Sequence, residues 1–174
     1  NKESRSNEKF IWNIKVSVAQ YYIDNLSEEV RKGQKEKIAQ GWLPAKPPLG
    51  YKTTGEQGHK IHVIDNEKAP LIRKMFEHYA SGNHSLKSLL NKINEEGLRN
   101  LNGGNVAKSR LHELLSDPFY YGKIRWKGQI YDGKQEPIIS KELFDMVQEK
   151  LLKKCWLIQK RIILRLLFAR KLIV

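Results

Sequence analysis

Cysteine is almost absent from the sequence, because the 174 residues contain only Cys155. A disulfide within one chain needs two cysteines, and a zinc site made only of thiolates needs several. One cysteine therefore excludes both kinds of cross-link. It also agrees with a reducing compartment, so we expect a cytoplasmic protein.

Long hydrophobic runs are absent as well. No apolar stretch approaches the roughly 20 residues that a membrane-spanning helix needs. The stretch 156–174 is rich in Ile and Leu, but Lys and Arg interrupt it repeatedly. No signal peptide is apparent near Asn1. We expect no membrane association and assign the tail no function, although a basic amphipathic helix on an anionic membrane is a competing interpretation.

Acidic residues are scarce relative to basic ones. The chain has 32 Lys and Arg against 19 Asp and Glu, which gives a net charge of +13. Each phosphate that Lys or Arg neutralises releases a condensed counterion and strengthens binding. The composition therefore favours a polyanionic partner, although charge by itself does not separate DNA, RNA and anionic lipid.

Signals for catalysis are missing from the sequence. The five histidines do not follow a metal-ligand spacing such as HExxH. Gly103-Gly104 lacks the strand and the lysine of a nucleotide-binding loop, and no serine has an evident activating base. We therefore expect no cofactor, metal, catalytic residue or small-molecule substrate, and no catalysis by this chain alone.

Residues 10–40 have the pattern of a long helix. Apolar residues recur every three or four positions, which places them on one stripe: Ile11, Ile14, Val18, Tyr22, Leu26 and Val30. Basic residues continue beyond the stripe: Arg31, Lys32, Lys35 and Lys37. We predict packing by the first half and phosphate contact by the second. Asn25 and Glu28 fit a capping box that would break the helix.

The remainder of the chain predicts an α+β fold that is mostly helical. A proline-rich loop at 42–51 precedes a short strand at 60–65, in which Ile61 and Val63 share the packing side. Three helices follow, the first from Asp65 or Asn66 and the second capped by Ser85. A β-hairpin then leads to a Ser140-capped helix.

The second and third of these helices resemble a helix-turn-helix, whose latter helix enters the DNA major groove. We expect the third helix at 106–116, capped by Asn105. Its predicted DNA-facing residues are Lys108, Ser109, Arg110 and His112. Arg110 has the donors to bind guanine O6 and N7 together. The alternative is an ordinary helical hairpin with a solvated face.

The predicted hairpin has Lys127-Gly128 at its turn. Ile124, Trp126 and Ile130 are its expected packing residues. Basic residues alternate onto one face and are candidates for phosphate contact: Lys123, Arg125 and Lys127.

A series of short motifs, in this order, resembles the recombinase domain of large serine recombinases, the resolvase/invertase-type integrases of phages and mobile elements. The matching segments run from about residue 10 to residue 152: Ala19–Tyr22, Val30–Gly33, Pro48–Lys52, Ala69–Arg73, Phe76–Gly82, Ser85-Leu86, Asn94–Leu98, Asp117–Gly122 and Pro137–Ile139 to Phe144. Each motif is weak individually, and their order makes the resemblance strong.

The resemblance implies a double-stranded DNA partner, an attachment half-site, and a bacterial or phage-encoded protein associated with the nucleoid. In the family, a serine nucleophile breaks both strands through a covalent 5′-phosphoserine link, and subunits rotate before religation. The long helix assists dimerisation and crosses the DNA, and the full-length protein forms dimers or tetramers. The helix-turn-helix-like unit would be 85–116.

The chain departs from the family pattern in three respects. It lacks the catalytic domain with its nucleophilic serine, and it lacks the cysteine-rich zinc ribbon. Gln135 also replaces the histidine expected before Pro137-Ile138-Ile139. We expect a linker and dimerisation helix at 1–41, a DNA-binding domain at 42–154 and an atypical tail at 155–174. Truncation or a frameshift would explain the tail.

The principal alternative function is a stand-alone helix-turn-helix DNA-binding regulator or a factor that directs recombination. Neither alternative implies a separate catalytic half.

Overall fold

The computed structural model describes residues 2–56 and 60–153. The chain divides into two compact units, Asn1–Gln40 and Gly41–Val174. We refer to them as unit 1 and unit 2. The predicted tail at 155–174, with Cys155, lies outside the described residues.

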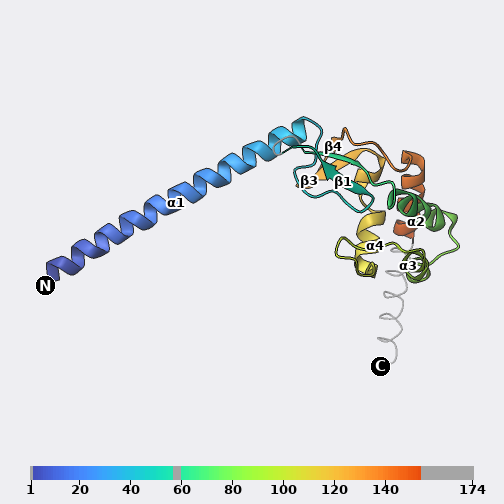
Figure 1. Cartoon of the computed structure of the whole chain (residues 1–174), viewed down its shortest axis with the longest axis horizontal. Coiled ribbons are helices and arrows are strands. Elements are labelled where there is room, and N and C mark those ends of the chain that lie inside the picture. The colour runs from blue at the N-terminus through green and yellow to red at the C-terminus, as the bar shows by residue number, and fades with distance from the viewer. Residues whose placement is uncertain (1, 57–59, 154–174) are drawn as a thin grey trace, which may run out of the picture. The chain divides into compact units, whose positions relative to one another are not determined.

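Unit 1 is a single continuous helix, α1 (Lys2–Ala39; Figure 1). The predicted break at Asn25 is wrong. Side-chain contacts one turn apart continue along this part of the helix: Gln20 donates to Asp24, the Ser27 hydroxyl donates to the Ile23 carbonyl, and Lys32 pairs with Glu29. Such contacts favour an uninterrupted helix over a cap.

The apolar side chains of α1 between Phe10 and Val30 are exposed, whereas Ile38 near its end is buried. Trp12 is 67% exposed, Leu26 66% and Val18 47%, so nothing within the described residues provides the predicted packing of the first half. The apolar surface is also wider than one stripe. Val16 lies two residues before Val18, about 200° around the helix, and is also exposed.

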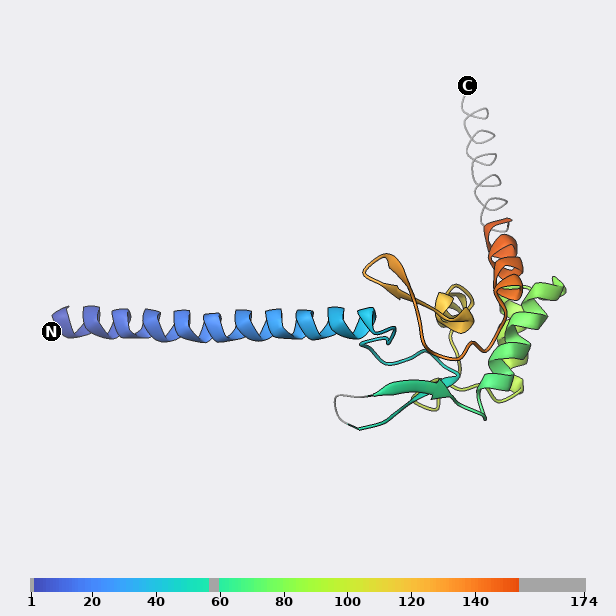
Figure 2. The same ribbon diagram turned by 90° about the horizontal axis from the view of Figure 1, so that it is seen from above.

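The protein is α+β and mostly helical, as predicted, and the strands belong to unit 2. The elements of unit 2 in order are β1 (Tyr51–Thr54), β2 (Ile61–Ile64), α2 (Ala69–Ser81), α3 (Leu86–Glu95), α4 (Lys108–Leu115), the 3₁₀ helix η1 (Pro118–Tyr121), β3 (Lys123–Trp126) and β4 (Gln129–Asp132). A helix at 141–153 follows. The strands form two antiparallel hairpins, which project from one end of unit 2, with α2 and the 141–153 helix at the other (Figures 1 and 2).

The first hairpin differs from the prediction in two ways. Strand β1 was not predicted, and it pairs with β2 so that Thr53 lies opposite His62. The packing side of β2 is also reversed, because His62 is buried whereas Ile61 is exposed. The His62 ring is buried because it hydrogen-bonds the Leu43 carbonyl through Nε2 at 3.0 Å and lies against Phe119, which gives a polar side chain partners in the interior.

Helix α2 begins three or four residues later than predicted. The Asp65 carbonyl accepts hydrogen bonds from the amides of Lys68 and Ala69, so Asp65 starts a turn before the helix. Ser85 caps α3 as predicted: its hydroxyl accepts a hydrogen bond from the Ser88 amide at 3.1 Å, and the Ser88 hydroxyl accepts one from the Ser85 amide. Likewise, the Ser140 hydroxyl accepts the Leu143 amide at the start of the last helix.

The centre of the core is η1. Its Phe119 and Tyr120 are buried against Tyr51 and Phe76, with ring centroids 4.9 Å apart for Tyr51–Phe119 and 5.4 Å for Phe76–Tyr120. The Tyr120 hydroxyl donates to the Leu49 carbonyl at 2.8 Å. The Tyr120 carbonyl accepts the amides of residues 138 and 139. This short segment thus joins the first hairpin, α2 and the approach to the last helix.

A candidate nucleic-acid interface

Helix α4 separates its apolar and polar side chains cleanly. Leu111, Leu114 and Leu115 are buried. The predicted DNA-facing residues lie on the other side: Lys108, Ser109 and His112 are exposed and Arg110 is half-exposed. Helix α3 packs against α4. The polar face of α4 is therefore available to a partner.

The start of α4 differs from the prediction. The N-cap is Ala107, which has extended backbone and makes no side-chain cap, so Asn105 is not the cap. Asn105 is instead tied to the preceding loop, through a bridge with Arg99 and through its carbonyl, which accepts Asn100 Nδ2 at 2.8 Å. Asn94 of α3 holds the entry to α4, because its Oδ1 accepts the Val106 amide at 3.0 Å.

Arg110 of α4 and Arg125 of β3 both act on Asp117, which follows the end of α4. Arg125 of β3 donates to the Ser116 carbonyl at 2.7 Å, and Arg110 pairs with Glu113 at 2.9 Å. The Asp117 carboxylate accepts the Phe119 amide at the start of η1. Burial raises the pKa of Asp117, while this hydrogen bond and the positive charges of Arg125 and Arg110 act to lower it. The fold thus gathers cationic side chains from two elements around one partly buried acid.

The second hairpin places the other predicted cations. Lys127 and Gly128 form its two-residue turn, both with positive φ, as a tight hairpin turn requires. Lys123 is ion-paired with Asp132 on the opposite strand. Ile124 is buried, as predicted, whereas Ile130 is 59% exposed and is not a packing residue. The hairpin covers the core with one strand only, because Ile124 faces inward while the outer strand β4 remains exposed.

The four basic residues of α1 do not share one face. Arg31 and Lys35 are four residues apart, so they lie on the same side of the helix. Lys32 is paired with Glu29, and Lys37, which is half-exposed, lies two residues beyond Lys35 on another side. Of the four, Arg31 and Lys35 have the best arrangement for joint contact with a phosphate backbone.

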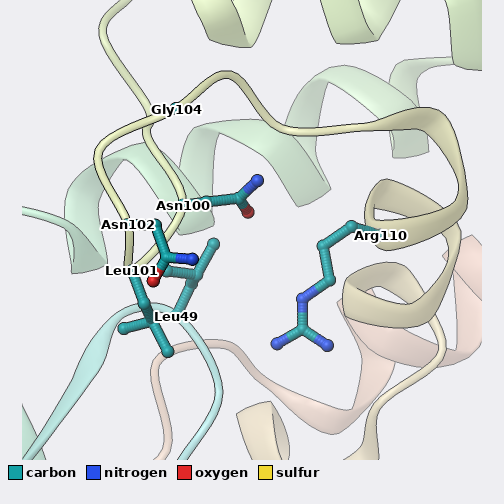
Figure 3. Close-up of a pocket in the computed structure, with 6 residues that line it drawn as sticks. All are labelled: Leu49, Asn100, Leu101, Asn102, Gly104 and Arg110. Carbon is teal, nitrogen blue, oxygen red and sulfur yellow. The ribbon is translucent and has the colours of Figure 1, made fainter.

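The loop between α3 and α4 adds residues that were not predicted. Asn100, Leu101, Asn102 and Gly104 line a hollow of about 390 Å³ together with Leu49 and Arg110 (Figure 3). The side chains of Asn100 and Asn102 point from the loop toward the space that the Arg110 guanidinium faces. The sequence marked this segment only as a polar turn, because the approach of Leu49 and Arg110 depends on the tertiary fold.

Gln135 occupies the position where a histidine was expected. It is 4% exposed, and its Nε2 donates to the carbonyls of Phe119 and Lys123. Its side chain therefore ties the second hairpin to η1 inside the protein and does not face a partner.

Within residues 2–56 and 60–153, no helix is both long enough and apolar enough to cross a membrane. No group of three or more His, Cys, Asp or Glu side chains gathers there in a way that could hold a metal ion.

Comparison with known families decides the relationship. The family model described as Recombinase matches residues 66–154, just over half of the chain. This chain belongs to the Recombinase family. The match covers α2 through the 141–153 helix, and with it α4 and the second hairpin. The resemblance to large serine recombinases that the sequence suggested is therefore confirmed.

Solved structures give the recombinase domain a similar fold. One, described as "Crystal Structure of a LSR-DNA Complex", is 22% identical with a TM-score of 0.60 and matches 72% of this chain and 38% of its own. Another, described as "Sequence Requirements of the Listeria innocua prophage attP site", is 22% identical with a TM-score of 0.59; the match covers 71% of this chain and 51% of that one. The recombinase chain thus spans about half or less of these proteins. No curated protein matched.

Proposed function

We propose that this chain is the DNA-binding portion of a serine site-specific recombinase and binds a double-stranded attachment half-site. The observation that carries the proposal is the polar face of α4, with Arg110 and Arg125 both acting on Asp117 at its end, in a member of the Recombinase family. Its fold is shared with a structure described as a complex with DNA.

In this proposal α3 and α4 act as a helix-turn-helix. Helix α4 enters the major groove, where Arg110 donates two hydrogen bonds to guanine O6 and N7, while Lys108, Ser109 and His112 contact neighbouring bases or phosphates. Lys123, Arg125 and Lys127 hold the adjacent backbone. The pairs Arg110–Glu113 and Lys123–Asp132 are partly exposed, and exposed ion pairs contribute only about 0–1 kcal/mol, so DNA can replace them at little cost.

Helix α1 has two roles in the proposal. Arg31, Lys32, Lys35 and Lys37 contact phosphates, with Arg31 and Lys35 acting together. The exposed apolar side chains between Phe10 and Val30 pack against other copies, in dimers or tetramers of the full-length protein. In that longer protein a serine nucleophile on another domain would cleave the DNA through a covalent phosphoserine link, and the whole would integrate or excise DNA inside the cytoplasm.

The test of DNA readout is a selection from random duplexes at about 150 mM salt with excess competitor, which suppresses purely electrostatic binding. Wild type should enrich one half-site. Arg110→Ala should cost about 1–3 kcal/mol and relax one base position. Lys87→Ala, which removes the same charge from an exposed position of α3, is the control. An unchanged base preference in Arg110→Ala would reject the assignment.

Lys35→Ala tests the phosphate role of α1. It should weaken binding to all duplexes alike and make the dependence of log K on log salt less steep by about one. A loss confined to a single sequence would contradict a phosphate contact.

Self-association is tested by sedimentation of the full chain over a range of concentrations. Val18→Glu puts a charge on the exposed apolar surface of α1 and should shift the protein toward monomer, whereas Ser17→Glu, one residue away on the polar side, should not. Equal sedimentation of both variants would count against association through this surface.

A further inference from the structure

The hollow beside Arg110 has a mixed lining that suits a particular ligand. Arg110 offers guanidinium N–H donors, of which Nη1 is used by Glu113. Asn102 adds an amide that makes no hydrogen bond within the described residues. Asn100 uses its Nδ2 on the Asn105 carbonyl, which leaves its Oδ1 as an acceptor. Donors and an acceptor thus line the same space (Figure 3).

The apolar part of the lining comes from two leucines. Leu49 is 1% exposed and forms part of the wall, and its carbonyl is held by the Tyr120 hydroxyl. Leu101 stands at the edge and is 60% exposed. A phosphate needs donors only and gains nothing from an acceptor or an apolar wall. The edge of a DNA base presents both donors and acceptors, and a thymine methyl group is apolar.

The loop that carries these residues is held in shape before any ligand binds. The Asn100 amide donates to the Gly104 carbonyl at 2.8 Å, and the Gly103 amide donates to the Asn100 carbonyl at 2.9 Å. Arg99 donates to the Asn94 carbonyl at 2.7 Å, which fastens the loop to α3. A site that is ordered in advance loses less conformational entropy on binding.

We propose that the hollow extends the base-reading surface of Arg110, so that the base pair whose guanine Arg110 binds is also bound by Asn102 as donor and Asn100 as acceptor. This inference rests on the proposed DNA-binding function. It assigns sequence specificity to the α3–α4 loop in addition to α4, and it makes Asn102 a specificity residue that acts on the same base step as Arg110.

The test repeats the selection with the full chain carrying Asn102→Ala. Because the Asn102 side chain makes no hydrogen bond in the described structure, its removal should leave the fold intact, as circular dichroism will show. The variant should lose roughly 5- to 100-fold in affinity for the selected site, with the preference at one base pair relaxed and affinity for random duplex unchanged. Asn91→Ala, an exposed asparagine of α3, should behave as wild type.

A second experiment uses a duplex that lacks the base at the position where Asn102→Ala relaxes the preference. Wild type and Asn102→Ala should bind this duplex equally, because the base that distinguishes them is gone. Uniform weakening on all duplexes would overturn the inference in favour of a phosphate contact. Unchanged selectivity in Asn102→Ala alongside relaxed selectivity in Arg110→Ala would overturn it while leaving the proposed function standing. Absence of any enriched sequence with wild type would overturn both.

Discussion

Most of the large apolar side chains of unit 2 are buried, whereas those between Phe10 and Val30 in unit 1 are exposed. Phe76 and Ile72 are fully buried, while Phe10 is 65% and Ile11 52% exposed. Helix α1 is stabilised in this chain by its own hydrogen bonds and by contacts one turn apart, but unit 2 has contacts between segments distant in sequence. Cooperative stability should therefore reside in unit 2, and the apolar surface of α1 contributes only when something covers it.

The largest expected difference is between a core and an α1 aromatic residue. Phe76→Ala removes a buried ring that contacts Tyr120 and Phe144, and it should lower the free energy of unfolding by about 3–5 kcal/mol. Trp12→Ala should change it by less than about 0.5 kcal/mol, since the side chain is exposed. Urea denaturation at low protein concentration measures both. Equal losses of unfolding free energy in the two variants would contradict the view that stability resides in unit 2.

The next effect concerns a single hydroxyl group. Tyr120→Phe leaves the Leu49 carbonyl without its buried donor and should cost about 1–3 kcal/mol. Tyr22→Phe removes a hydroxyl from a side chain of α1 that is 68% exposed and should be neutral. The same denaturation experiment applies, and a neutral Tyr120→Phe would show that this bond does not stabilise the core.

Serine substitutions give a smaller contrast. Ser85→Ala deletes the hydroxyl that accepts the Ser88 amide at the start of α3 and should cost about 1 kcal/mol, while the bond from the Ser85 amide to the Ser88 hydroxyl remains. Ser27→Ala removes a hydroxyl that bonds back to the Ile23 carbonyl within α1, and alanine is the better helix former, so stability should be unchanged or slightly higher. Thermal unfolding followed by circular dichroism distinguishes them, and a reversed order would contradict this account.

The smallest effect is a pH dependence at Asp117. Because burial raises its pKa in the folded state, the folded protein binds the proton more tightly than the unfolded chain does. Stability from this group is therefore greatest below the ordinary aspartate pKa and decreases as pH rises through the raised value. Asp117→Asn should remove this decrease, so the free energy of unfolding of the variant should rise relative to that of wild type as pH increases. Asp24→Asn on exposed α1 is the control, and parallel stability profiles for Asp117→Asn and wild type would refute the prediction.

Much of unit 2 was predictable because its signals are local. The apolar spacing of Ile72, Met75, Phe76 and Tyr79 and the αL glycine at Gly82 define α2. Ser85 and the Lys127-Gly128 turn were found for the same reason, since caps and tight turns depend on adjacent residues. The candidate site was predictable only in part: the polar face of α4 follows from helical periodicity, whereas the loop asparagines do not.

The errors share a physical cause. Ile61 and Val63 were assigned to the packing side of β2 on hydrophobicity, but the Leu43 carbonyl and Phe119 make the opposite side suitable for His62. Asn105 was assigned as a cap from its residue type, but the loop uses it elsewhere. In both cases a hydrogen-bond partner more than three residues away in sequence decided the outcome.

The sequence by itself determined the sign of the charge, the presence of the main helices, the Ser85 and Ser140 caps and the hairpin turn; each of these structural features depends on residues within a few positions of one another. Only the tertiary structure decided that Arg110 and Arg125 both act on Asp117, and that Arg110 faces Asn100, Asn102 and Leu49 across a hollow. These neighbours come from separate segments, and the packing of η1 and α4 in one core brings them together.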